Sequence, residues 1–130
     1  MTGLDEAPVV AVVDDDARML ESVQDLLESA GYTAHIFLSA HKFLESGVLV
    51  KADCLITDIG MPVTDGFELC RKARQRRPDL PVIFITGRSE TTTQERAAAE
   101  GYHGLFRKPF DAAELLAAVD HAVVTRPSRE

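Results

Sequence analysis

Three kinds of chemically useful side chain recur along this 130-residue sequence, each directly after an apolar run. Asp14, Asp15 and Asp58 offer carboxylates, Thr86 offers a hydroxyl group and Lys108 offers an ammonium group. Carboxylates held close together repel one another unless a hard cation lies between them, and Mg²⁺ prefers such oxygen ligands. A carboxylate beside Mg²⁺ can attack a phosphoryl donor. Because a hydroxyl and an ammonium group can bind the transferred oxygens, these residue types indicate phosphoryl transfer onto an aspartate.

The apolar residues that separate these side chains follow two alternating patterns. Apolar and β-branched runs predict strands at residues 9–13, 33–38, 54–57, 82–85 and 105–107. Apolar residues spaced by three and four predict helices at residues 18–30, 39–44, 67–77, 89–101 and 112–123. Parallel strands require helical crossovers, so this alternation predicts a single α/β domain. Its expected architecture is a doubly wound, five-stranded parallel sheet with five helices on its two faces.

The candidate chemical residues all follow the carboxyl ends of predicted strands. These ends share one edge of a parallel sheet, where ligands bind, so residues distant in sequence converge there. Taken singly, an aspartate there can start a turn and a lysine is commonly solvated. Together they form a complementary set, which favours a functional site. Asp16 is the exception, because an aspartate before a helix is typical of an N-cap, as are Ser39 and Asp111 before later helices.

Charge and cysteine usage exclude several other functions. The net charge of −7 argues against a nucleic-acid-binding surface on this domain. No apolar run approaches the ~20 residues of a membrane span. Residues 1–7 are acidic and lack the features of a secretion signal, so we expect a cytoplasmic protein. Cys54 and Cys70 lie in apolar stretches without metal-ligand spacing, and we expect reduced thiols in the core.

A basic cluster occupies the predicted helix at residues 67–77. Its members are Arg71, Lys72, Arg74, Arg76 and Arg77. Such a cluster is typical of a solvated helix face, and it would also suit a docking surface. The sequence leaves both interpretations open.

Four motifs in order carry a resemblance to a known family. They are Val12-Val13-Asp14-Asp15, the segment 55–62 (LITDIGMP) with Asp65-Gly66, Ile85-Thr86-Gly87, and Lys108-Pro109-Phe110. Together they resemble the receiver domain of bacterial two-component response regulators, over residues 8–124. The motifs ITGR and RKPF are most similar to those of nitrogen-fixation regulators. The resemblance implies a flavodoxin-like, chemotaxis-regulator-like sheet with strand order 2-1-3-4-5, with residues 1–7 and 125–130 as tails.

The resemblance also implies a role for each acidic residue. Asp58 would accept a phosphoryl group from a histidine kinase or a phosphotransfer protein. Asp15 would bind Mg²⁺ directly, Asp14 largely through water, and Gly60 through its backbone carbonyl. Asp58 would complete the metal site. The protein would then catalyse only its own phosphorylation and dephosphorylation, and would not be an enzyme in the ordinary sense.

The remaining motif residues would convert phosphorylation into a change of shape. Thr86 would move toward the phosphoryl group and Lys108 would be its cationic partner, held by a cis bond to Pro109. One further position departs from the family pattern, and another lies where receivers adjust the rate of dephosphorylation. Leu105 stands where receivers commonly carry an aromatic switch residue, and the sequence leaves the effect undetermined. Arg88, two residues after Thr86, could touch the phosphate or reach across the path of the water that attacks it during dephosphorylation.

The implied partners follow from the same resemblance. Besides the phosphodonor, we expect a homodimer or partner surface on the fourth helix, fifth strand and fifth helix, and no direct nucleic-acid binding by this domain. Relatives commonly carry a helix-turn-helix output domain that regulates transcription. The sequence does not distinguish a stand-alone receiver from one separated from its output domain.

Two other functions remain as alternatives. One is a receiver-like interaction module that works without phosphorylation. The other is a haloacid-dehalogenase-like phosphatase that would use Asp14 and Asp16. The phosphatase is disfavoured because Arg18 stands where those enzymes have a small residue, and because Asp58 would have no role.

Overall fold

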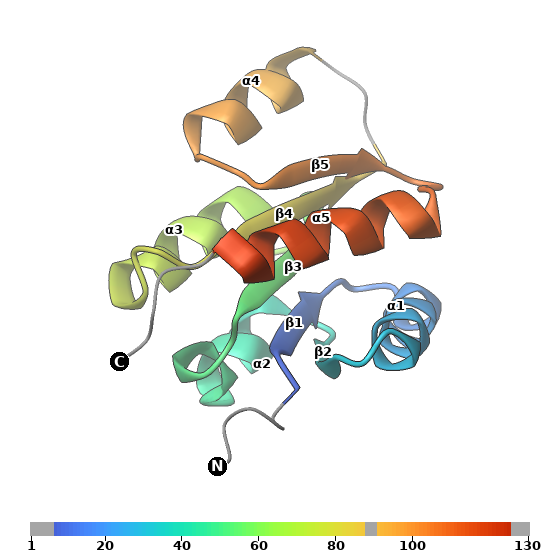
Figure 1. The fold of residues 1–130 in the computed structure, drawn as a ribbon. Helices are drawn as coiled ribbons and strands as arrows, with labels where there is room; N and C mark the ends of the chain where they lie inside the picture. Colours follow the sequence, from blue (N-terminus) through green and yellow to red (C-terminus); the bar gives the residue numbers. More distant parts are fainter. Residues whose placement is uncertain (1–6, 88–90, 126–130) are drawn as a thin grey trace.

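The computed structural model describes residues 7–87 and 91–125, with the backbone alone for residues 91–93. One parallel sheet has the order β2-β1-β3-β4-β5 (Figure 1). The strands are β1 (Val9–Val13), β2 (Thr33–Phe37), β3 (Cys54–Asp58), β4 (Val82–Thr86) and β5 (Gly104–Arg107). The helices are α1 (Ala17–Ser29), α2 (Ala40–Glu45), the 3-10 turn η2 (Val48–Val50), α3 (Gly66–Arg76), α4 (Thr91–Ala99) and α5 (Ala112–Thr125). The predicted fold class and strand order are confirmed.

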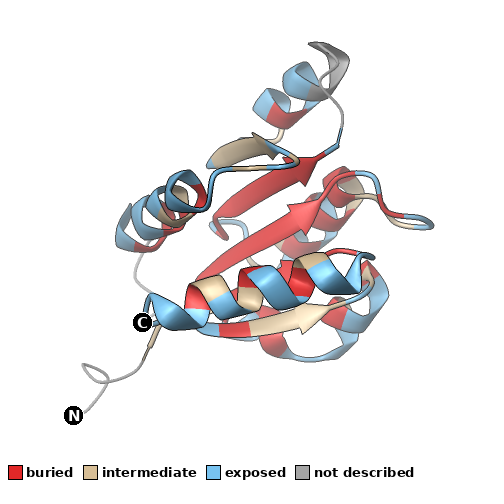
Figure 2. Cartoon of the chain, turned by 90° about the vertical axis from the view of Figure 1, so that its right-hand side faces the viewer, coloured by how far each residue is buried: buried red, intermediate tan, exposed pale blue. Residues whose placement is uncertain are grey.

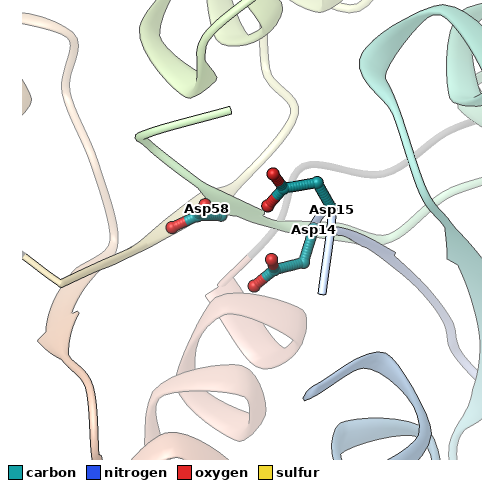
Figure 3. A group of neighbouring side chains, drawn as sticks. All are labelled: Asp14, Asp15 and Asp58. Carbon is teal, nitrogen blue, oxygen red and sulfur yellow. The ribbon is translucent and has the colours of Figure 1, made fainter. Parts of the chain in front are cut away.

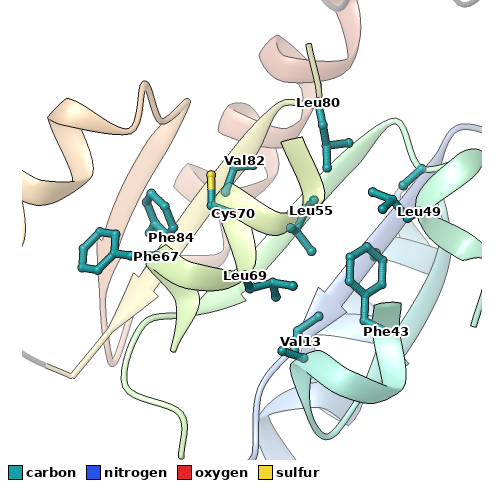
Figure 4. Close-up of a cluster of buried hydrophobic side chains, with 14 of the residues drawn as sticks. Val13, Phe43, Leu49, Leu55, Phe67, Leu69, Cys70, Leu80, Val82 and Phe84 are labelled. Carbon is teal, nitrogen blue, oxygen red and sulfur yellow. The ribbon is translucent and has the colours of Figure 1, made fainter. Parts of the chain in front are cut away.

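The sheet separates two hydrophobic cores. Successive strand residues point to opposite faces, so Val10 and Val12 pack with α1 and α5, whereas Ala11 and Val13 pack with α2 and α3. The central strands β3 and β4 are buried along their whole length (Figure 2). Figure 4 shows the core between the sheet and α2, η2 and α3. Burial on both faces explains why these strands are uninterrupted apolar runs.

Side-chain caps fix the starts of four helices. The Asp16, Ser39, Asp65 and Asp111 side chains accept hydrogen bonds from the backbone N–H groups of Arg18 and Met19, Lys42, Glu68 and Glu114, respectively. The predicted caps at Asp16, Ser39 and Asp111 are therefore confirmed. Each cap satisfies a donor that the first helical turn leaves without a partner.

The boundaries differ from the prediction in small ways. β3 and β4 each extend one residue further, so they end at Asp58 and Thr86 themselves. Thr125, expected in the C-terminal tail, is the last residue of α5, where its hydroxyl donates to the carbonyl of His121 at 2.8 Å. The turn η2 was not expected. The predicted start of the fourth helix at residue 89, Arg88 and most of both tails lie outside the described residues.

The basic cluster of α3 is largely occupied by contacts within the domain. Arg77 Nη1 donates to the carbonyl oxygens of Leu49 and Ala52 at 2.7 and 2.9 Å, beside η2. Arg74 binds backbone carbonyls after α3 and after α4, and Arg71 forms an ion pair. Arg74 and Arg77 are therefore half-buried and bonded within the domain, whereas Arg71 stays exposed beside its ion pair. The docking surface stays a prediction. The spacing of the arginines on the helix did not reveal carbonyl partners that only the tertiary structure supplies.

Two expectations, on membrane spans and on the cysteines, can be compared with the structure. Across the described ranges, none of the helices has the length and apolar character needed to cross a membrane. Cys54 and Cys70 are buried free thiols, as expected. Burial, with a smaller effect from Asp53, raises the pKa of Cys54 to about 12, so this thiol stays protonated at neutral pH.

Gly66, the first residue of α3, permits a close approach between helix and sheet. A Cβ atom at this position would lie 2.4 Å from the carbonyl oxygen of Asp58 and 2.9 Å from Cα of Ile59. The N–H of Gly66 donates to the carbonyl of Ile59 at 2.9 Å. The Asp-Gly pair therefore does more than make a turn, because the glycine brings α3 against the backbone that carries Asp58.

We expect Gly66→Ala to destabilise the protein by roughly 1–3 kcal/mol, because the added methyl group overlaps backbone atoms that cannot rotate away. Gly87→Ala is the matched control, since no atom of the described residues lies within 4 Å of a Cβ atom there. The control should be neutral or slightly stabilising. Urea denaturation of both variants measures the difference, and equal midpoints would contradict the close approach.

Candidate functional site

Three carboxylates meet at the carboxyl edge of the sheet. Asp14 and Asp15 directly follow β1, and Asp58 ends the neighbouring strand β3. One oxygen of each lies within 4.8 Å of an oxygen of the others (Figure 3). Asp14 and Asp58 are only 1% and 7% exposed, whereas Asp15 is exposed. The predicted convergence of these aspartates is confirmed.

Lys108 links the two buried carboxylates. Its Nζ lies 3.0 Å from Oδ2 of Asp14 and 3.5 Å from Oδ1 of Asp58. The backbone N–H of Lys108 donates to the carbonyl of Thr86 at 2.8 Å, which holds the loop after β5 against the end of β4. The bond from Lys108 to Pro109 is cis, as the resemblance implied. The lysine therefore reaches the acidic residues from the loop that follows β5.

The buried carboxylates are held in an unfavourable environment for charge. Burial raises the pKa of Asp14 and that of Asp58, although the ammonium group of Lys108 lowers both. Neighbouring carboxylates raise them further: Asp58 acts on Asp14, and Asp15 acts on Asp58. Burial acts to lower the pKa of Lys108, but its contacts with the two aspartates raise it overall. Among the described groups at this cluster, one ammonium faces three carboxylates, so a divalent cation would relieve the excess negative charge.

The donor set fits Mg²⁺. Oxygen ligands at an edge open to solvent on the Asp15 side suit an ion that keeps several of its waters. A backbone hydrogen bond from Gly60 lowers the pKa of Asp58, so this glycine lies next to the carboxylate. Its role as a carbonyl ligand stays a prediction. When bound, Mg²⁺ would supply charge neutralisation for an incoming phosphoryl group.

Thr86 is placed at the same edge. It ends β4, one residue beyond Ile85, which pairs with Asp58 in the sheet, and its side chain is 3% exposed. Its proposed movement toward a phosphoryl group is not tested by this arrangement. The proposed contact of Arg88 lies outside the described residues.

Asp16 contributes to the site in a way that the sequence did not indicate. Its side chain caps α1 and is not part of the carboxylate group, in agreement with the prediction. Its backbone N–H, however, donates to Oδ1 of Asp14 at 3.0 Å. Any residue other than proline offers this N–H, so side-chain identity carried no signal of it. The start of α1 therefore orients the buried Asp14 carboxylate.

Comparison with known proteins gives a consistent family. Residues 10–120 match the response regulator receiver domain. The response regulator protein TodT of Pseudomonas putida is 33% identical over 125 residues, which cover 96% of this chain and 55% of TodT. The transcriptional regulatory protein FixJ of Azorhizobium caulinodans is 37% identical over 114 residues, which cover 88% of this chain and 54% of FixJ. This chain thus spans about half the length of these relatives.

Solved structures agree with this result. The crystal structure of FixJ-N has a TM-score of 0.83 and 27% sequence identity, and covers 95% of this chain and 98% of FixJ-N. The BeF3-activated DrrB receiver domain has a TM-score of 0.83 and 29% identity, and covers 91% of this chain and 98% of that domain. The resemblance and the fold predicted from the motifs are confirmed.

The raised pKa values predict how stability depends on pH. Because the folded state raises the pKa of Asp58, keeping this carboxylate ionised costs folding free energy at neutral pH. Without metal, Asp58→Asn should therefore be more stable than wild type at pH 7.5, by about 1 kcal/mol or roughly 2–6 °C in Tm. As the pH falls through the raised pKa, the wild-type carboxyl becomes protonated and this advantage should shrink.

Thermal unfolding at pH 7.5 and at a series of lower pH values measures this effect. Asp25→Asn, on the exposed side of α1, is the control and should leave Tm nearly unchanged at each pH. Mg²⁺ should raise the Tm of wild type more than that of Asp58→Asn. A lower Tm for Asp58→Asn than for wild type at pH 7.5 would contradict the claim that the ionised Asp58 carboxylate destabilises the folded state.

Proposed function

Because this chain belongs to the response regulator receiver domain family, we propose that it accepts a phosphoryl group on Asp58 from a histidine kinase or a phosphotransfer protein. The observation that carries this proposal is the group of Asp14, Asp15 and Asp58 with Lys108 bound to the two buried carboxylates. The phosphorylated state would switch a partner or dimer surface. The domain proposed for this function spans residues 8–124.

The proposed reaction is an in-line displacement at phosphorus. An Asp58 carboxylate oxygen attacks the phosphorus of a phosphohistidine and forms a P–O bond, while the P–N bond breaks. The electron pair of that bond stays on the imidazole nitrogen, which takes a proton from water. Asp14 and Asp15 would hold the metal that neutralises the phosphoryl oxygens. Gly60 would add its backbone carbonyl to this shell.

Lys108 and Thr86 would read the phosphorylated state. Lys108 lies 3.5 Å from Asp58 in the resting arrangement, within reach of a phosphoryl oxygen on that carboxylate. In this proposal it exchanges part of its contact with Asp14 for the phosphoryl group. The Thr86 hydroxyl, at the end of the adjacent strand, would move toward the same group. The receiver is then a switch that acts on no substrate other than its own Asp58.

The biological setting follows from the relatives. Several are transcriptional regulators of about twice this length or more, so we propose that the receiver controls an output domain or a separate effector in the cytoplasm. The face made by α4, β5 and α5 is the proposed dimer or partner surface, without direct nucleic-acid contact by this domain. The phosphatase alternative loses support because the Asp16 side chain is bonded to the start of α1.

Phosphorylation should be confined to Asp58, because Asp14 and Asp15 are assigned to the metal in this proposal and Asp58 lies between them and Lys108 as the remaining carboxylate of the group. Wild-type protein incubated with acetyl phosphate and Mg²⁺ should gain the mass of one phosphoryl group. Asp58→Asn should gain none, and the control Asp25→Asn should behave as wild type. Intact-protein mass spectrometry measures the incorporation, and full incorporation in Asp58→Asn would overturn the assignment.

Mg²⁺ binding should depend on Asp15 and not on its neighbour Asp16. Asp15→Ala should lose most Mg²⁺ affinity by calorimetry and most phosphorylation, because it removes an exposed ligand. Asp16→Ala is the matched control: it should lose about 1 kcal/mol of stability through the helix cap but keep the metal. Lys108→Ala should keep Mg²⁺ and lose the structural response to phosphorylation. Unchanged Mg²⁺ affinity in Asp15→Ala would place the metal elsewhere.

A further inference from the structure

The described side chains at α4 contact the rest of the domain mainly through arginines. Among the described side chains of this helix, residues 94–99, only Ala97 is buried. The guanidinium carbon of Arg96 lies 4.3 Å from the ring centroid of Phe67, at the start of α3. This is the geometry of a cation–π contact. The middle of α4 therefore rests on α3 through one small apolar side chain and one arginine.

The end of α4 is attached more firmly. Arg74 of α3 donates from Nη2 to the carbonyl of Gly101 at 3.0 Å and from Nη1 to the carbonyl of Glu100. The same side chain donates to the carbonyl of Leu80, which fixes its orientation. Arg71 adds an ion pair to the Glu100 carboxylate at 2.9 Å. Several charge-assisted hydrogen bonds thus hold the residues that follow α4.

Phe67 connects the Arg96 contact to the candidate phosphorylation site. It directly follows Gly66, which is packed against the backbone of Asp58 and Ile59. Its side chain is 2% exposed, and its ring lies 5.1 Å from that of Phe84 in the core (Figure 4). A change in the backbone around Asp58 must therefore shift Phe67 or strain its packing. Either outcome alters the surface on which the Arg96 guanidinium rests.

We propose that the Arg96–Phe67 contact holds α4 in its resting position, and that α4 moves about its C-terminal end, held by Arg71 and Arg74, when Asp58 is phosphorylated. This inference rests on the proposed function. The contact between Arg96 and Phe67 is single and depends on ring geometry, whereas the end of α4 is held by several hydrogen bonds. The contact at Arg96 is therefore the one that a small displacement breaks first.

Thermodynamic linkage gives this proposal a distinctive consequence. A contact present only in the resting state opposes activation, so its removal shifts the population toward the active state. A ligand that binds the active state then binds more tightly. A substitution that only damages the fold does not increase the affinity for such a ligand. The direction of the affinity change therefore distinguishes loss of a resting-state contact from damage to the fold.

The test measures the affinity of the full chain for beryllofluoride in the presence of Mg²⁺, by NMR titration. Arg96→Ala should bind about twofold to fivefold more tightly than wild type, the range expected for a partly exposed cation–π contact. Arg96→Lys keeps the charge but loses the planar stacking, and should lie between the two. Glu95→Ala on the exposed side of the same helix is the matched control and should bind as wild type does.

A second substitution tests the partner ring. Phe67→Leu keeps an apolar side chain but removes the ring, and in this background Arg96→Ala should have little further effect on affinity. Amide hydrogen exchange of wild type should rise in α4 with beryllofluoride, while Glu100 and Gly101, whose N–H groups bond within the end of the helix, stay protected. Lys72→Ala, which breaks an ion pair confined to α3, is the control for changes in that helix.

The outcomes separate this inference from the proposed function. Wild type that fails to bind beryllofluoride overturns the proposed function and the inference that rests on it. Wild type that binds, with Arg96→Ala equal to it or weaker, overturns the inference alone. Equal loss of protection along α4 and at residues 100–101 overturns the fixed C-terminal end.

Discussion

The interaction on which the rest of the site depends is the ion pair of Lys108 with two carboxylates that are almost completely buried. Asp14 and Asp58 cannot both remain ionised beside each other without compensation. Lys108 supplies part of this compensating charge. It follows the edge strand β5, which β3 and β4 separate from β1. The position of the β5–α5 loop, and hence of α5, is therefore constrained by the charge at the carboxyl edge.

The two-sided core stabilises the strands that carry this charged edge. β3 and β4 are buried on both faces, so the strands that end in Asp58 and Thr86 are the least able to move. The hydrophobic contribution of these strands, roughly 25 cal/mol per Å² of apolar surface buried, offsets the penalty of the acidic cluster. The carboxylates thus stay close while α4, whose described side chains bury little, lies outside this rigid centre.

Sequence patterns predicted the fold and the acidic group because both follow from local rules. Apolar runs mark buried strands, and the topology of a parallel sheet then places every strand end at one edge. The roles of Gly66 and Arg74 were not predictable in this way. The close approach of Gly66 to Asp58 and the carbonyl partners of Arg74 depend on where α3 lies relative to other segments. The same holds for the N–H of Asp16, which every residue but proline provides.

The position of Leu105 connects these observations. Alternation along β5 places Leu105 on the face of the sheet that carries α3 and α4, and Phe106 on the opposite face with α5. Leu105 pairs with Phe84 on β4, and Phe84 packs on Phe67. A leucine cannot present a ring to α4, whereas Phe67 at the start of α3 presents its ring to Arg96. With Leu105 at this position, the proposed coupling between α4 and the site runs through Phe67 and Arg96. Phe106 cannot supply the missing ring, because it lies on the opposite face of the sheet.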